Sequence, residues 1–131
     1  MYTKIEFLNI LYAIVIPFDT QFSGVEFITD ELQEFQIGIM KRDDSNDVPK
    51  HRHLDQKREI LKTSESLIIL DGSLSISLWN NDNIFIKTLT INRPSLVTLF
   101  TGYHRIIFNS ETKLIEIKQG PYSASKDKIY E

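Results

Sequence analysis

Three histidines are the side chains in this sequence that are best suited to chemistry. His51 and His53 stand two positions apart at the start of "KHRHLDQKREILKTSESLIILDG", residues 50–72, and His104 is the third. Alternate residues of a β-strand point to the same face. On a strand, His51 and His53 would therefore form a pair able to bind a metal, for which neutral imidazole is the commonest ligand. A third ligand must then come from another strand, and His104 is the remaining histidine. The alternative is two surface histidines beside a polar loop.

Two charged residues downstream of the histidine pair could take part in such a site. Glu65 can ligate a metal, act as a general base, or orient a ligating histidine from outside the ligand set. Arg58 lies five positions after His53 and has a guanidinium that can bind a carboxylate or phosphate through two hydrogen bonds. Its alternative role is that of a solvated charge in the polar run "DQKRE".

A polar face is also expected on the last strand. Glu116 and Lys118 alternate with Ile115 and Ile117. If the polar face points inward, Glu116 and Lys118 can form an ion pair in a pocket. If it points outward, they are ordinary edge charges. Gln36 either reaches the same pocket or faces solvent.

Composition excludes several classes of protein. The 131 residues contain no cysteine, and the net charge is −3 from 15 basic and 18 acidic residues. Disulfides and thiolate metal sites are therefore excluded, a reducing, cytoplasmic location is expected, and the basic surface typical of nucleic-acid binders is missing. The apolar run at residues 7–18 is too short to cross a bilayer and lacks a signal-peptide cleavage site. We expect a buried strand there and no membrane contact.

The pattern along the chain predicts an all-β single domain spanning residues 1–131. Short segments rich in β-formers, several of them alternating, occur about ten times, and only residues 30–36 could form a helical turn. Asp71 and Gly72 predict a hairpin between residues 66–70 and 74–79. After Gly120 the polar tail should lie over the fold or fray. The strand candidates are residues 11–16, 25–29, 35–40, 58–63, 66–70, 74–79, 84–91, 96–101, 105–108 and 114–118.

The order of these features resembles the cupin superfamily. In that family H-x-H is followed by a glutamate, six residues, a glycine and a later histidine; Glu65 and Gly72 fit the spacing. Within the superfamily the chain is similar to a group of uncharacterised cupins often associated with sugar or polysaccharide biosynthesis. The matching stretches are His51, His53, Arg58, "TSE" at 63–65, "IEIKQGPY" at 115–122 and "DK" at 127–128. The resemblance extends over residues 12–130. Two stretches depart from the pattern: "NRPS" at 92–95 and "TGYHRIIF" at 101–108.

The resemblance implies a double-stranded β-helix, or jelly-roll barrel, with a divalent metal at its mouth. The metal would be Zn, Fe, Mn, Ni or Cu, held by His51, His53 and His104, with Glu65 as a further ligand or as the catalytic group. The ligand would be a small carbohydrate, a sugar or a sugar nucleotide, bound by Arg58, Gln36, Glu116 and Lys118. Catalysis and binding without turnover both remain open. Apolar residues on both faces of "LYAIVIPF" and "LVTLF" predict a homodimer.

Overall fold

A computed structural model describes residues 1–131 and contains ten β-strands without an α-helix. The all-β class is therefore confirmed. The chain divides into two compact units, which are described separately. The large unit comprises residues 1–20 and 62–131, and the small unit comprises residues 21–61. No segment forms a helix long and apolar enough to cross a membrane.

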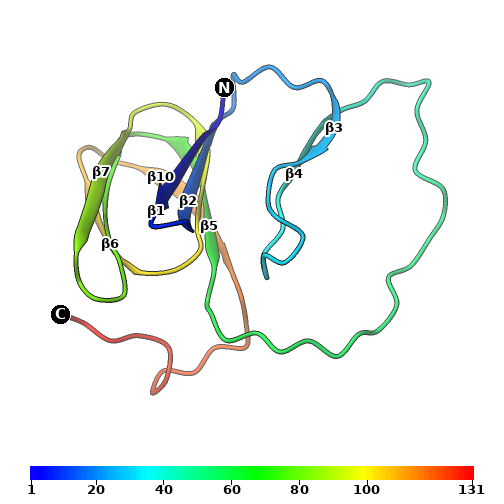
Figure 1. Ribbon diagram of the computed structural model, residues 1–131. Coiled ribbons are helices and arrows are strands. Elements are labelled where there is room, and N and C mark those ends of the chain that lie inside the picture. The colour runs from blue at the N-terminus through cyan, green and yellow to red at the C-terminus, as the bar shows by residue number, and fades with distance from the viewer. The chain divides into compact units, whose positions relative to one another are not determined.

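The large unit consists of two antiparallel sheets. In Figure 1, β6 and β7 lie on one side of this unit, and β1, β2 and β5 lie on the other. The five-stranded sheet has the order β1 (Thr3–Phe7), β2 (Ile10–Pro17), β8 (Ser95–Leu99), β5 (Glu65–Asp71), β10 (Lys113–Lys118). The three-stranded sheet has the order β7 (Phe85–Ile91), β6 (Leu74–Trp79), β9 (Tyr103–Phe108).

The two sheets share one hydrophobic core. Along β6, Leu74, Ile76 and Leu78 are buried, and the residues between them are less so. This period of two is expected of a strand with one face in a core. Burying a side chain of this size contributes about 1.5 to 3 kcal/mol. The core side chains that β5 and β8 contribute from the other sheet are Leu67, Ile69, Val97 and Leu99.

The predicted hairpin at Asp71 and Gly72 is wrong. The strand before this turn pairs with β8 and β10, whereas the strand after it pairs with β7 and β9. The turn therefore carries the chain from one sheet to the other. Gly72 has φ +99°, and an added Cβ would lie 2.4 Å from the carbonyl oxygen of Glu111. Only glycine meets both requirements without strain.

The turn at residues 80–83 does form a hairpin, between β6 and β7. The side-chain oxygen of Asn80 accepts hydrogen bonds from the backbone N–H groups of Asp82 and Ile84, at 3.0 and 2.9 Å. An asparagine at this position thus mimics a backbone turn and fixes the loop.

The small unit contains one two-stranded antiparallel sheet, β3 (Gly24–Phe27) with β4 (Gly38–Lys41). A hydrogen-bonded turn, not a helical one, begins at Asp30, whose carbonyl accepts from the backbone N–H of Gln33 at 2.9 Å. Residues 42–64 form no strand. The strand expected at 58–63 is therefore wrong, and of the two alternatives for residues 51–53 the one that places the histidines on a strand is not what the structure shows.

Candidate functional site

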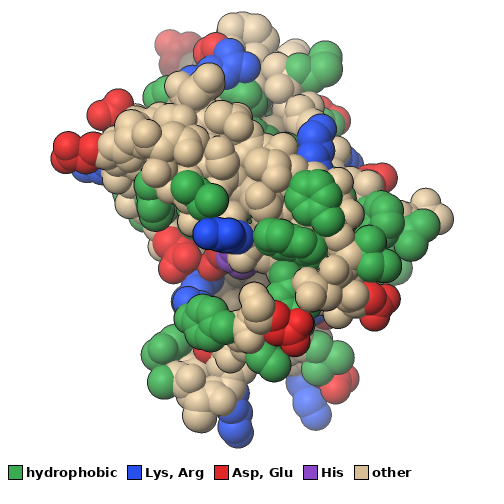
Figure 2. Space-filling model, turned by 90° about the vertical axis from the view of Figure 1, so that its left-hand side faces the viewer, with side chains coloured by type: hydrophobic (Ala, Val, Ile, Leu, Met, Phe, Trp, Pro, Cys, Tyr) green, Lys and Arg blue, Asp and Glu red, His purple; other side chains and the backbone are tan.

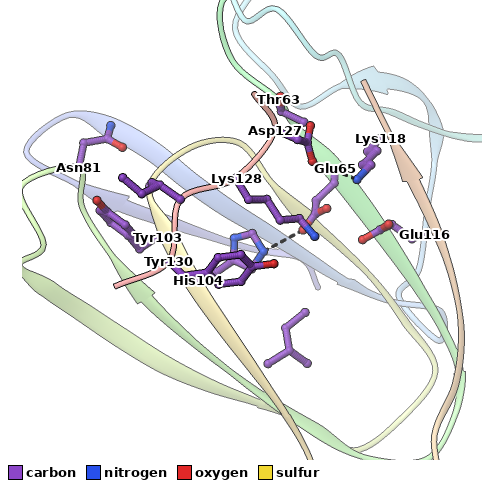
Figure 3. A pocket seen from close by; sticks show the side chains of 13 residues that line it. Thr63, Glu65, Asn81, Tyr103, His104, Glu116, Lys118, Asp127, Lys128 and Tyr130 are labelled. Carbon is purple, nitrogen blue, oxygen red and sulfur yellow. Dashed lines mark hydrogen bonds and ion pairs between the residues drawn. The ribbon is translucent and has the colours of Figure 1, made fainter. Parts of the chain in front are cut away.

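A pocket of about 480 Å³ opens in the large unit. Its walls come from β5, β9 and β10, from the residues just before β5 and β9, from the β6–β7 turn, and from the C-terminal segment (Figure 3). Its lining mixes acidic, basic, aromatic and aliphatic side chains. They are Thr63, Glu65, Asn81, Gly102, Tyr103, His104, Ile106, Glu116, Lys118, Asp127, Lys128, Ile129 and Tyr130.

Glu65 and His104 meet in this pocket from opposite sheets. Glu65 begins β5 on the same face as the buried Leu67. His104 pairs with the buried Leu78 across β9 and β6, so it also faces inward. His104 Nε2 lies 2.9 Å from Glu65 Oε1, and the two side chains are 35% and 12% exposed. The alternation of both strands thus places a carboxylate and an imidazole in hydrogen-bonding contact.

The surroundings of Glu65 favour its ionised form. The hydrogen bond with His104 is the main cause, and it holds the pKa of Glu65 below its ordinary value despite burial. Glu116 lies beside this carboxylate, and its pKa is raised by desolvation and by the proximity of Glu65. Two neighbouring carboxyl groups therefore have pKa values shifted in opposite directions.

Lys118 pairs with Glu65 in the strand register, so Glu116 and Lys118 share the inward face of β10. Ile115 and Ile117 lie on the other face and are about half exposed. Glu116 and Lys118 therefore line the pocket and do not share the outer face with the two isoleucines. The ion-pair partner of Lys118 is Asp127, with Nζ 3.4 Å from Oδ2, and not Glu116 as the sequence suggested. Desolvation lowers the pKa of Lys118, but Asp127 and other carboxylates outweigh it, and the pKa is raised.

Two pocket residues, Lys128 and Tyr130, were not anticipated from the sequence. Tyr103 lies beside His104 on β9, and Lys128 and Tyr130 come from the polar tail (Figure 3). Desolvation and the nearby Glu131 carboxylate raise the pKa of Tyr103. The only signal for the tail was the "DK" pair in the family resemblance. The space-filling view likewise shows a histidine recessed in a hollow, surrounded by charged and hydrophobic side chains (Figure 2).

The other predicted metal ligands belong to the small unit. His51 and His53 are exposed, and their ring centroids are 5.4 Å apart at an interplanar angle of 70°. His51 Nδ1 is 2.8 Å from the carbonyl oxygen of Pro49. The two imidazoles therefore lie side by side even though no strand carries them. That they meet His104 remains a prediction.

Two predicted substrate-binding residues also belong to the small unit. Arg58 is exposed in the segment without strands and forms no ion pair. The amide of Gln36 accepts a hydrogen bond from Thr29 Oγ1 at 2.8 Å and donates to the carbonyl oxygens of Asp30 and Gln33, each at 2.7 Å. These bonds occupy the amide in shaping its own loop.

Neither unit by itself brings three histidine, aspartate or glutamate side chains into a geometry that would hold a metal ion. Each contributes one close pair of potential donors, His51 with His53 and His104 with Glu65. Imidazole nitrogen with carboxylate oxygen suits transition metals. The pair in the pocket could also bind the hydroxyl groups of a ligand or exchange a proton with it.

Comparisons with known proteins do not identify the chain. No protein-family model matches it, and no curated protein or solved structure is significantly similar to it. The residues of the pocket are therefore the basis for a functional assignment.

Proposed function

We propose that this chain is a cupin-type protein that binds a divalent metal ion and takes a small carbohydrate ligand in the adjoining pocket. The metal ligands in this proposal are His51, His53 and His104. The observation that supports it most strongly is the hydrogen bond between His104 and Glu65 in the pocket. Histidines that ligate a metal usually direct their second ring nitrogen to a carboxylate in this way.

This hydrogen bond assigns a role to Glu65. It occupies the Nε2 atom of His104, so Nδ1 is the nitrogen left for a metal. Glu65 then orients the imidazole and increases its basicity, without being a ligand itself. Of the alternatives open from the sequence, the outer-sphere role fits this geometry best.

His51 and His53 supply the second part of the ligand set. Their adjacent rings offer two imidazole nitrogens from one short segment. The proposal requires that this segment bring them to His104. His104 lies on β9, an edge strand of its sheet, and β10 is an edge strand of the other. Edge strands have unpaired backbone groups that accept further strands. The two edge strands belong to separate sheets and do not pair with each other, so the jelly-roll barrel is part of the proposal.

The chemistry of the donors fits Zn, Fe, Mn, Ni or Cu, since three neutral imidazoles leave open coordination positions. When bound, the ion would supply a Lewis acid for a carbonyl or hydroxyl group, or activate water or dioxygen. The protein residues bind and orient the ligand: Glu116 and Lys118 offer hydrogen-bond partners on β10, and Tyr103 offers an aromatic face on β9.

A carbohydrate fits this lining. About 480 Å³ is within the range of pockets that bind small molecules. A sugar ring has an apolar face suited to a tyrosine and hydroxyl groups suited to carboxylates and ammonium groups. In this proposal, Arg58 binds an anionic substituent of the ligand, such as the phosphate of a sugar nucleotide. Gln36 has its amide occupied in its own loop, and we assign it no ligand contact.

Metal titration of chelator-treated protein tests the proposal. Calorimetry with each of the five metals should give about one tightly bound ion per chain for at least one of them. Absence of stoichiometric binding of all five would contradict the metal site. Sugars and sugar nucleotides are then screened by thermal shift, with and without the bound metal.

The second candidate function is binding or sensing without turnover. Some pocket side chains are already paired with one another, such as Lys118 with Asp127. These pairs fix the side chains in place before a ligand arrives, which favours a pre-formed binding site. Product analysis of the ligands found in the screen separates the two functions. Turnover that a chelator abolishes indicates an enzyme, and binding without product indicates a sensor or carrier.

A further inference from the structure

The C-terminal segment crosses the pocket from one sheet to the other. Asp127 pairs with Lys118 on β10 of the five-stranded sheet, with Nζ and Oδ2 3.4 Å apart. Four residues later, the Glu131 carboxylate accepts a hydrogen bond from Asn83 in the β6–β7 turn of the three-stranded sheet, at 3.5 Å. Figure 3 shows the part of the segment that carries Asp127, Lys128 and Tyr130 beside the other labelled pocket residues. We call residues 123–131 the strap.

The residues between these two contacts face the pocket. Lys128, Ile129 and Tyr130 all line it, although most of the strap is solvent-exposed. Asp127 is the exception, because its side chain is only 12% exposed. A long polar tail would ordinarily fray. Burial of one carboxylate against one ammonium group explains why this tail is held in place.

The two charged side chains that the strap brings to the pocket differ, because Asp127 is paired with a residue of opposite charge and Lys128 is not. The pocket carboxylates Glu65 and Asp127 each have a basic partner within 4 Å, whereas Lys128 has no acidic partner. Lys128 and Tyr130 therefore present an unpaired cation and an aromatic ring to whatever occupies the pocket.

We propose that the strap is the outer wall of the ligand site, latched by the Lys118–Asp127 ion pair, and that Lys128 and Tyr130 contact the ligand and contribute to its selection. The His104 side chain is 35% exposed with the strap in place, so opening the strap widens an existing access to it, and the latch sets how often the strap opens. This proposal extends the proposed function, because it adds ligand-contacting residues and a gate to the same pocket.

Access to His104 tests the latch without any knowledge of the ligand. Diethyl pyrocarbonate acylates accessible histidines, and peptide mass spectrometry gives a separate modification rate for each of the three. Asp127→Asn removes the charge of the latch while keeping its shape. Losing about 1 kcal/mol from the closed state should raise the rate at His104 by up to about fivefold, the limit being set by the reaction that the 35% exposed imidazole already undergoes. A chain that ends at Tyr122 should show at least the same increase.

Three controls keep the result interpretable. Lys126→Gln removes a neighbouring exposed charge that makes no side-chain contact with the pocket, so it should leave the rate at His104 unchanged. In metal-free protein, where no ion joins the three histidines, His51 and His53 belong to the small unit and do not line the pocket, so their rates should be the same in every variant. Circular dichroism verifies that each variant is folded.

A measurement on the unaltered protein covers the case in which a variant fails to fold. Hydrogen exchange of residues 123–131 should be slower than in a free peptide of the same sequence, and the protection should decrease at high salt, which screens ion pairs. Equal His104 rates in all folded variants, or a tail that exchanges like the peptide, would overturn the proposal. Neither outcome depends on metal or sugar binding, so a failed strap is distinguishable from a failed function.

Discussion

Glu65 and Glu116 are neighbouring carboxyl groups whose environments act on their charges in opposite directions. The hydrogen bond with His104 lowers the pKa of Glu65, whereas desolvation and the Glu65 carboxylate raise the pKa of Glu116. Pairs of carboxyls separated in this way are typical of sites where one group stays ionised and the other holds a proton more readily. Both effects can be measured as a pH dependence of stability.

Glu65→Gln tests the first effect. Because the folded protein holds the pKa of Glu65 below its ordinary value of 4.5, the unfolded chain binds more protons near that pH. The stabilisation is therefore complete above this pH and is lost as the pH falls through the folded pKa. We expect Glu65→Gln to lower the free energy of unfolding by about 1 kcal/mol at pH 7. Urea denaturation of metal-free protein should show this difference shrink in acid.

Glu116→Gln should show the opposite sign and is the matched comparison. Its raised pKa means that the folded protein binds the extra proton, so the native Glu116 becomes less favourable as the pH rises above 4.5. The variant should match the wild type near pH 4 and gain stability relative to it by pH 8. If both variants lose stability equally at pH 8, the two carboxyls do not have opposing environments.

At the scale of the element, the residue types at the turns predicted where the chain changes direction. They did not predict whether the strands before and after a turn pair with each other. The asparagine-rich turn at residues 80–83 joins paired strands, whereas the turn at Gly72 leads to the other sheet. Both have good turn residues. The difference comes from strand pairs such as β5 with β10, whose residues lie more than forty positions apart. A local sequence window does not contain this information.

Strand prediction failed where the alternation of apolar residues was weak. Strand β1 was missed because Ile5 is its only buried residue. Strand β6 was found because its buried leucine and isoleucine side chains alternate with serines. The sequence left open whether the HRH segment is a strand or a polar loop. The segment has no apolar face, and it joins no sheet.

Gly72→Ala tests the crossing between the sheets. The new Cβ would meet backbone atoms of Glu111 and Thr112 at 2.4 and 2.6 Å, and the backbone has φ +99°. We expect a loss of about 2 kcal/mol or more in the free energy of unfolding. Gly120→Ala is the control, because a Cβ there meets nothing within 4 Å and should change stability by less than about 0.5 kcal/mol. Equal effects would contradict the close approach.

At the scale of the whole molecule, part of the site was predictable from the sequence. Glu65, His104, Glu116 and Lys118 were all named from the sequence, and they line one pocket. The period of two on β10 and the order of the cupin-like motif carried that information. Residues of the strap were not named as site residues, because an irregular polar tail has no periodicity that indicates what it faces.

The homodimer remains a prediction, but the surface that would form its interface differs from the one that the sequence suggested. Tyr12, Ile14 and Ile16 of "LYAIVIPF" are buried in the single chain, so this strand does not supply the exposed surface. Ile115, Ile117 and Leu70 on β10 and β5 are exposed by 50%, 52% and 39%. An apolar face at the edge of a sheet is a common dimer contact.

Light scattering at micromolar concentration should give the mass of two chains. Ile117→Lys should shift it to the mass of one, because a charge in the interface would be desolvated without a partner. Leu8→Lys, which alters a residue 76% exposed in the β1–β2 turn, should leave the dimer intact. A wild-type monomer, or a dimer that survives Ile117→Lys, would rule out this interface.

Metal content of histidine variants tests the central claim most directly. Wild type, His53→Ala, His104→Ala and Arg58→Ala are loaded with metal, desalted and analysed by inductively coupled plasma mass spectrometry, with circular dichroism as the check of folding. We predict about one ion per chain in the wild type and in Arg58→Ala, and almost none in either histidine variant, since two remaining ligands hold an ion poorly. Full occupancy in His53→Ala or His104→Ala would contradict the proposed site.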